Sequence, residues 1–208
     1  KFPLPSLLNF FLRFSQEKDN QDMSSFVKNT LIKISQGGIN DRLEGGFHRY
    51  TVDNLWHIPH FEKMLYDNSQ LLSIFSKAYK VYKEPRFKEE LYNIYDFLEL
   101  KMTGKNNLIY SSISADTNYD DGTKEEGDFY IWKKEELEEL LGKDFIWVSK
   151  YYNINEIGYW ERDSYVFFQT ISDNQFASDL NIDLEEFKNK IKKINKILFE
   201  YREKRIQP

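Results

Sequence analysis

One short segment of this 208-residue sequence contains all the side chains that exchange protons most readily at neutral pH. All three histidines, His48, His57 and His60, fall within 13 residues, and four of the nine glycines lie just before them, between positions 37 and 46. Because histidine titrates near neutrality, it can donate or accept a proton during a reaction. We therefore expect a functional site, if the chain has one, within residues 37–68.

Polar residues are predicted on the apolar face of the helix that follows. A helix that begins at Pro59 and advances by about 100° per residue places His60, Asp67 and Asn68 on the side of its apolar residues. Buried polar groups are hydrogen-bonded or face a cavity, so two interpretations stay open. One is an internal network in which Asp67 accepts from Lys63 or from a backbone N–H. The other is a polar pocket in which His60 shuttles a proton and Asp67 orients it.

Metal binding and nucleotide binding find little support in these spacings. His57 and His60 straddle a proline, so their rings need not converge, and the chain has neither cysteine nor an H-E-x-x-H motif. The acidic segment 116–126 departs from the EF-hand pattern and is better explained as a solvated hairpin. The glycine pairs at 37–38 and 45–46 lack the spacing of a phosphate-binding loop. We predict no metal and no cofactor.

Composition narrows the range of partners and compartments. A net charge of −5 argues against a nucleic-acid-binding surface, and no apolar run approaches the length of a membrane span. The absence of cysteine excludes disulfides and thiol catalysis within this chain and favours a cytoplasmic protein. We therefore expect neither a nucleic acid nor a membrane as partner.

Helical periodicity dominates the chain, with irregular and partly β loops between the helices. Glycines and prolines delimit the helices, and alternating apolar residues indicate short strands. Helices are predicted over residues 5–18, 22–36, 59–82, 85–102, 134–141, 144–152 and 183–205. Strands are predicted over residues 108–115, 128–132 and 164–170, and a hairpin near residues 47–52. This pattern indicates a mainly α fold with β-hairpin loops.

A long block of the sequence resembles a known family. The block runs from Gly37 to Leu72 and contains HFEKMLYDN, and three shorter stretches follow in the family's order: SADT, EEGDFYIW and YREKRIQP. Together they are similar to the spermatogenesis-associated protein 20-like family of thioredoxin-domain-containing proteins. The resemblance implies that residues 1–208 form the N-terminal part of an incomplete (α/α) toroid, related to six-hairpin glycosidases and N-acylglucosamine 2-epimerases. It also implies that a thioredoxin-like domain and the C-terminal half of the toroid lie outside this chain.

The resemblance implies a carbohydrate-binding or carbohydrate-active domain, with a sugar or another small polar molecule as its ligand. Because fold alone does not determine function, the alternative is a non-catalytic structural or interaction module that works with a thioredoxin-like domain. The expected catalytic residues are His60, His48, Asp67 and Asp53. The expected ligand-binding residues are Arg49, Tyr50, Trp56, Lys63, Asn68, Asp116, Tyr130 and Trp132.

The sequence departs from the family pattern at three places. Glu44 stands where the family usually has a third glycine, residues 118–124 lengthen an acidic turn, and Tyr159-Trp160 replaces an Asn-Phe pair. A half toroid would also leave apolar helix flanks uncovered. We therefore expect self-association or pairing with a separate C-terminal half.

Overall fold

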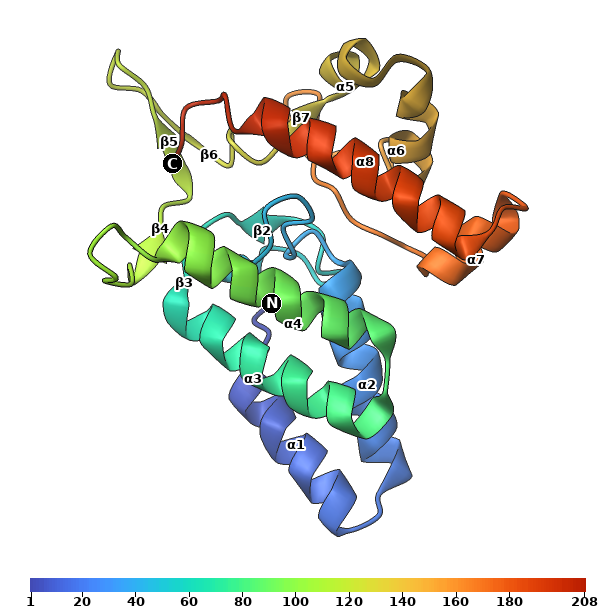
Figure 1. Ribbon diagram of the computed structural model, residues 1–208. Helices are drawn as coiled ribbons and strands as arrows, with labels where there is room; N and C mark the ends of the chain where they lie inside the picture. Colours follow the sequence, from blue (N-terminus) through green and yellow to red (C-terminus); the bar gives the residue numbers. More distant parts are fainter. The chain divides into compact units, whose positions relative to one another are not determined.

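Two helical hairpins dominate the first part of the structure, a computed structural model that describes residues 1–208 (Figure 1). Their helices are α1 (Pro5–Glu17), α2 (Gln21–Gln36), α3 (Leu65–Tyr82) and α4 (Pro85–Phe97). α1 packs on α2 and α3, and α3 lies along α4. α4 continues without a break into a π-helical turn, η1 (Leu98–Met102). The chain divides into two compact units, and these helices belong to unit 1, Lys1–Ala115.

The core of unit 1 follows from apolar residues at helical spacing on the four helices. Its fully buried helical residues are Val27, Leu31, Ile34, Leu71, Ile74, Phe75, Ala78, Phe87 and Ile94. Phe75 packs against Phe47 of the loop and Phe87 of α4, with ring centres 5.6 and 5.7 Å apart. The loop between the hairpins therefore contributes to the same core as the helices do.

Two short antiparallel strand pairs complete unit 1. β1 (Tyr50–Thr51) pairs with β2 (Pro59–His60), and β3 (Lys63–Met64) pairs with β4 (Ser112–Ile113). In the first pair Tyr50 lies opposite His60. The predicted hairpin near residues 47–52 therefore forms, with its second strand supplied by residues 59–60.

The segment from Pro59 to Met64 is extended, which corrects the predicted start of the third helix. Every second residue, beginning with Pro59, is buried, and the intervening residues, His60 among them, are half-buried. This period of two is the pattern of a strand and not of a helix. Because α3 begins only at Leu65, the prediction that His60 lies on the apolar face of a helix is wrong.

Unit 2, Asp116–Pro208, combines short strands with five helical segments. The strands are β5 (Asp116–Asn118), β6 (Lys124–Glu126), β7 (Trp132–Lys133) and β8 (Ser164–Tyr165). The helices are α5 (Lys134–Leu141), the 3₁₀ turn η2 (Gly142–Asp144), α6 (Phe145–Tyr151), α7 (Asp173–Asp179) and α8 (Leu184–Arg202). β5 pairs with β6 and β7 with β8, both antiparallel. α8 packs against α6 and α7.

Aromatic rings fill the core of unit 2. The Phe167 ring lies 5.7 Å from Trp132 and 4.7 Å from Tyr152, nearly parallel to both. Stacked rings at these separations contribute about 0.5–1.5 kcal/mol per pair beyond their buried area. The predicted strand over 164–170 is paired only at residues 164–165, because Phe167 and its neighbours turn into this core instead of extending the sheet.

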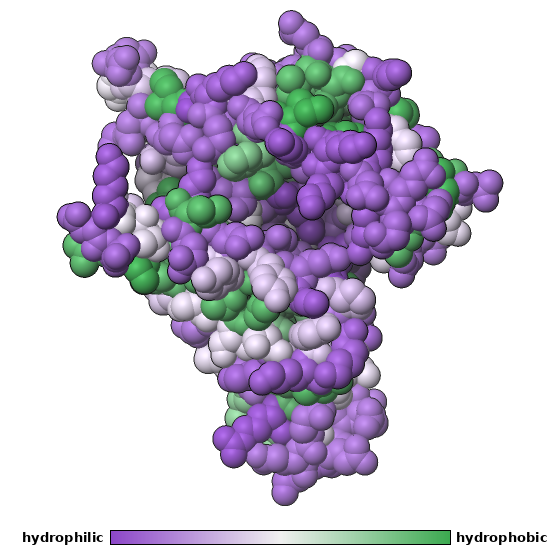
Figure 2. All heavy atoms as spheres, viewed as in Figure 1, coloured by the Kyte–Doolittle hydropathy of each residue, from purple (hydrophilic) through white to green (hydrophobic).

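The structure is mainly α with short antiparallel strand pairs, as predicted from the periodicity. None of its helices combines the length and the apolar composition needed to cross a bilayer. The face in Figure 2 is largely hydrophilic and carries separate apolar patches. Exposed large apolar side chains include Phe10, Leu55, Leu100 and Leu108.

Candidate functional site

A buried lysine holds the glycine-rich loop of unit 1 in place. Nζ of Lys63 donates to Oδ2 of Asp41 at 2.7 Å, to Oε2 of Glu44 at 3.0 Å and to the carbonyl oxygen of Gly45 at 3.0 Å. The side chain is fully buried, and its ammonium lies 4.6 Å from the centre of the Phe97 ring. An ammonium has three N–H donors, so these contacts leave none of them for a ligand.

Glu44 is paired with two lysines. Its Oε2 binds Lys63, and its Oε1 lies 2.9 Å from the ammonium of Lys101 in η1. A second ion pair, between Arg42 and Glu90 at 3.4 Å, joins the same loop to α4. The negative side chain at position 44 therefore ties the loop to the end of the α4–η1 helix.

Glycine is required where this loop meets α4. Gly45 and Gly46 have φ values of +83° and +74°, which side chains with a Cβ rarely adopt. A Cβ at Gly46 would lie 2.5 Å from the ring of Phe97. The two glycines thus allow the close packing that brings Glu44 and Gly45 to Lys63.

Asp67 and Asn68 are buried in the first turn of α3, as the sequence predicted. Oδ1 of Asn68 accepts from the backbone N–H of Phe47 at 2.7 Å. Its Nδ2 donates to the carbonyl oxygens of Phe47 and Met64, both at 2.9 Å. The amide therefore pairs with the loop backbone as a strand would, and Asn68 positions residue 47 in the core.

Two of the expected catalytic residues stabilise the loop over residues 39–58. Nδ1 of the buried His48 lies 2.8 Å from the carbonyl oxygen of Phe61, and its ring packs edge-on against the Phe61 ring. The carboxylate of Asp53 accepts hydrogen bonds from three backbone N–H groups between positions 55 and 58. Both side chains are thus directed into the loop.

The remaining polar side chains of the segment form one partly exposed group, which we call the polar cluster. Its members are Arg49, Tyr50, His60, Glu62, Tyr66 and Asp67. The register of β1 and β2 brings Tyr50 against His60. The extended backbone that follows turns Glu62 to the same side as His60. The first turn of α3 supplies Tyr66 and Asp67.

Arg49 lies at the centre of the polar cluster. Its Nε donates to the hydroxyl of Tyr66 at 3.1 Å, and its Nη1 donates to Oε2 of Glu62 at 3.1 Å. The same oxygen of Glu62 lies 4.0 Å from Nε2 of His60. The His60 ring stacks on Tyr50, with ring centres 5.0 Å apart and planes at 22°. One guanidinium thus links the strand residues to the helix residues.

Asp67 combines burial with an unpartnered oxygen. The residue is 8% exposed, and its Oδ2 is buried with no hydrogen-bond partner. Burial raises the pKa of Asp67 to about 6. The charge of Arg49 opposes the rise, the charge of Glu62 adds to it, and a hydrogen bond between the carboxyl group and Tyr66 opposes it. A carboxyl group that changes protonation near pH 6 can donate or accept a proton under mild conditions.

Glu62 and Tyr66 were not among the expected site residues. The helical projection placed Glu62 on the solvent side, because it began the helix at Pro59. Alternation along PHFEKM would have identified the strand, but it is visible only when Lys63 is counted as a buried residue. Because lysine is ordinarily exposed, the buried Lys63 hides the alternation of buried and half-buried residues along this strand.

The expected aromatic ligand-binding residues are buried. Trp56 in unit 1 is 4% exposed, and in unit 2 Tyr130 is 7% and Trp132 1% exposed. Trp56 also has a positive φ of +66° and packs against Gly37, where a Cβ would lie 2.3 Å from the Trp56 carbonyl oxygen. Asp116, also in unit 2, lies opposite a glutamate in the β5–β6 hairpin. Of the predicted residues, the structure brings together Arg49, Tyr50, His60 and Asp67.

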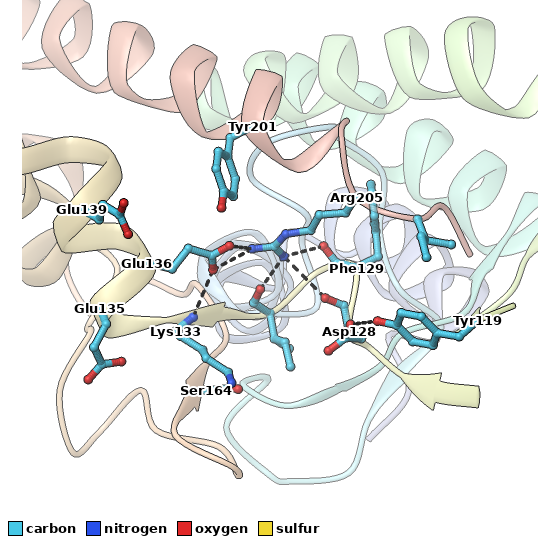
Figure 3. A pocket seen from close by; sticks show the side chains of 12 residues that line it. Tyr119, Asp128, Phe129, Lys133, Glu135, Glu136, Glu139, Ser164, Tyr201 and Arg205 are labelled. Carbon is cyan, nitrogen blue, oxygen red and sulfur yellow. Dashed lines mark hydrogen bonds and ion pairs between the residues drawn. The ribbon is translucent and has the colours of Figure 1, made fainter. Parts of the chain in front are cut away.

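Unit 2 contains a cleft of about 660 Å³ at the end of α8. Arg205 occupies its centre: Nη2 binds both oxygens of Glu136 at 2.7 and 2.8 Å, and Nη1 donates to the carbonyls of Phe129 and Ile131 (Figure 3). The guanidinium also lies 4.2 Å from the Trp132 ring centre. Arg205 therefore fastens the C-terminal tail to α5 and to the turn before β7.

Tyr119 lies at another edge of this cleft, on the β5–β6 hairpin (Figure 3). Its hydroxyl donates a hydrogen bond to the carboxylate of Asp128, which raises the pKa of this phenol to about 12. No three acidic or imidazole side chains of the chain converge closely enough to hold a metal ion. Arg205 and Tyr119 therefore stabilise the fold around the cleft. We take the polar cluster of unit 1 as the candidate site.

Comparisons with curated proteins identify relatives of the chain. An uncharacterized protein of Caenorhabditis elegans is 33% identical over the whole chain, which spans 32% of that protein. Spermatogenesis-associated protein 20 of Mus musculus is 32% identical over 76% of the chain and 22% of its own length. The protein of the same name from Rattus norvegicus is 35% identical over 68% of the chain and 18% of its own length.

The chain thus spans about a third of the worm relative and about a fifth of the mammalian relatives. No family model matches it. The mammalian matches nevertheless agree with the family to which the block Gly37–Leu72 points. These similarities support a place for the chain in the spermatogenesis-associated protein 20 family.

Proposed function

We propose that unit 1 binds a carbohydrate at the polar cluster and that Asp67 exchanges a proton with it. In this proposal the chain contributes the opening hairpins of an (α/α) toroid to a longer protein that carries a thioredoxin-like domain. The observation that carries the proposal is the buried Oδ2 of Asp67, which has no hydrogen-bond partner within the protein. A ligand hydroxyl would supply the missing partner.

The composition of the cluster favours a sugar over other small molecules. Sugar hydroxyls both donate and accept hydrogen bonds, and the cluster offers donors on Arg49 and acceptors on Glu62 and Asp67. Beside them, the ring of Tyr50 stacks on His60 with centres 5.0 Å apart, and the ring of Phe2 packs on Tyr50 at a tilt, with centres 4.7 Å apart. Aromatic faces pack well on the apolar C–H faces of sugar rings.

Proton transfer by Asp67 suits epimerase-like or glycosidase-like chemistry. A raised pKa keeps part of its carboxyl population protonated near pH 6, so the same group can act as acid or as base. Arg49 and Glu62 lie next to it and would orient the ligand's oxygens. In this scheme His60 contributes a ring surface at the edge of the site.

The alternative is a structural or interaction module without catalysis. It is favoured by the way Lys63, Asn68, His48 and Asp53 are all committed to holding the loop. Under this alternative Asp67 would belong to the same scaffold. Its unpartnered oxygen argues against that role, because scaffolding polar groups are ordinarily hydrogen-bonded.

Saturation-transfer NMR with a panel of neutral monosaccharides and disaccharides tests the proposal. We expect signals from at least one sugar, and we expect Asp67→Asn to weaken its binding. Asp22→Asn is the matched control, because Asp22 is an exposed acid in the first turn of α2. Absence of binding by every sugar, or equal binding by wild type and Asp67→Asn, would overturn the proposal.

A further inference from the structure

Two arginines of this chain differ sharply in how completely they are bonded. Arg205 uses both of its terminal nitrogens, Nη2 in a two-oxygen contact with Glu136 and Nη1 in hydrogen bonds to backbone carbonyls. Arg49 uses only Nε and Nη1, each in one hydrogen bond of 3.1 Å. Its Nη2 donates to no group of the protein, and 38% of the side chain is exposed. Arg49 therefore retains free donors facing solvent.

The carboxylate that neutralises Arg49 is weakly held. Glu62 binds Arg49 through one oxygen only, its side chain is 25% exposed, and Nε2 of His60 lies 4.0 Å from the same oxygen. Ion pairs of this kind contribute about 0–1 kcal/mol. A two-oxygen contact to a guanidinium is stronger and geometrically more specific. A ligand oxyanion that offers two oxygens would therefore displace Glu62 from Arg49.

The surroundings of Arg49 also suit a negative group. The first turn of the 18-residue helix α3 contributes Tyr66 and Asp67 to the cluster; its first N–H donates to the carbonyl of Ser111, it has no side-chain cap, and its dipole favours a negative group. Asp67 would repel an anion only when ionised, and in its protonated form it offers an O–H donor through the oxygen that now lacks a partner. Glu62, His60 and Tyr66 are the other titratable side chains around the site.

We propose that the polar cluster selects sugars that carry an oxyanion, a carboxylate or a phosphate, which Arg49 binds with Nη1 and Nη2 after Glu62 turns away. This inference rests on the proposed sugar site and adds the class of substrate. Arg49 is the specificity-determining residue, and Glu62 is a built-in competitor for its guanidinium.

Titration calorimetry on the whole chain at about pH 6 tests the inference with glucose, glucuronate, glucose 6-phosphate and inorganic phosphate. We expect at least one acidic sugar to bind about tenfold more tightly than glucose, which corresponds to one charge-assisted pair. Arg49→Met removes this preference, so that the acidic sugars bind to the variant no more tightly than glucose does. Glu62→Gln strengthens binding of the acidic sugar about threefold or more, because the competitor is removed.

The control variant is Arg13→Met, which removes a more exposed arginine that is also paired through one contact, with Glu17. It should leave all affinities unchanged. If glucose binds as tightly as the acidic sugars, or if Glu62→Gln weakens their binding, the inference fails and the proposed sugar site stands. If no sugar binds and only inorganic phosphate does, the proposed function fails and the inference fails with it.

Discussion

Nζ of Lys63 lies 2.7 Å from Oδ2 of Asp41, and both side chains are buried. This ion pair joins the glycine-rich loop to the strand that precedes α3. A buried charge is tolerated only when its partner is present. The pair therefore fixes the glycine-rich loop against the strand that contains Lys63. The partly exposed polar cluster includes other residues of these same segments.

Replacement of Lys63 by Met should destabilise the protein by about 3–5 kcal/mol, because Asp41 would be left buried without its cation and Glu44 would keep only Lys101 of its two lysines. Urea unfolding followed by circular dichroism measures the loss. The triple variant Lys63→Met, Asp41→Asn, Glu44→Gln should recover part of it. Lys80→Met, at an exposed position of α3, is the control and should change stability little.

Asp67→Asn should stabilise the folded state at about pH 8, by about 1–3 kcal/mol. The pKa of Asp67 is raised from 3.8 to about 6 on folding, so the folded protein holds its proton more tightly than the unfolded chain does. Each pKa unit corresponds to about 1.4 kcal/mol. The favourable contribution of Asp67 is complete below pH 3.8 and is lost as the pH rises through 6.

The advantage of Asp67→Asn should therefore shrink between about pH 6 and pH 4 and vanish below that range. Urea midpoints of both proteins at several pH values measure this. The control Asp22→Asn, in the exposed first turn of α2, should show no such pH-dependent gain. A variant that is less stable than wild type at every pH would assign Asp67 to the scaffold.

Asn68→Ala should cost about 2–4 kcal/mol. The substitution removes three hydrogen bonds and leaves the N–H and C=O of Phe47 without partners in the core. Amide hydrogen exchange at Phe47 should accelerate in this variant. Ser69→Ala, at the neighbouring exposed position of α3, is the control; equal protection of Phe47 in both variants would contradict the role given to Asn68.

Arg205→Lys should destabilise unit 2 by about 1–3 kcal/mol, because an ammonium cannot reproduce the two-oxygen contact with Glu136 together with the bonds to two carbonyls. Thermal unfolding followed by tryptophan fluorescence reports on unit 2, which contains three of the four tryptophans. Arg162→Lys, at a 70% exposed position, should leave the midpoint unchanged.

Helical periodicity was sufficient to predict most of the helices of both units. α1, α2 and α8 follow their predicted ranges within a few residues, because each presents one apolar stripe to its core. The beginning of α3 was wrong because Pro59 is equally suited to an edge strand and to a helix N-terminus. Pro59 lies in a strand because it pairs with Thr51. A pairing between residues eight positions apart cannot be recognised from the local sequence around Pro59.

Both the composition and the geometry of the candidate site were predictable only in part, since Glu62 and Tyr66 were not among the expected residues. The sequence indicated Arg49, Tyr50, His60 and Asp67, and the structure brings these four together. It could not show that His48 and Asp53 are turned into the loop, because their partners are backbone groups that every residue carries. Any residue can supply a backbone hydrogen-bond partner, so the sequence does not indicate where such a bond forms.

Asp67 and Asn68 are consecutive in the sequence but differ in how their side chains are hydrogen-bonded. The amide of Asn68 is fully bonded to its own chain, whereas the carboxyl of Asp67 keeps an oxygen without a partner. Saturation mutagenesis screened for abundance in cells should therefore tolerate many residues at position 67 and few at 68. A screen for activity in the full-length protein should reject changes at positions 67 and 68 alike. A comparison of the two screens therefore distinguishes a residue needed for folding from a residue needed for function.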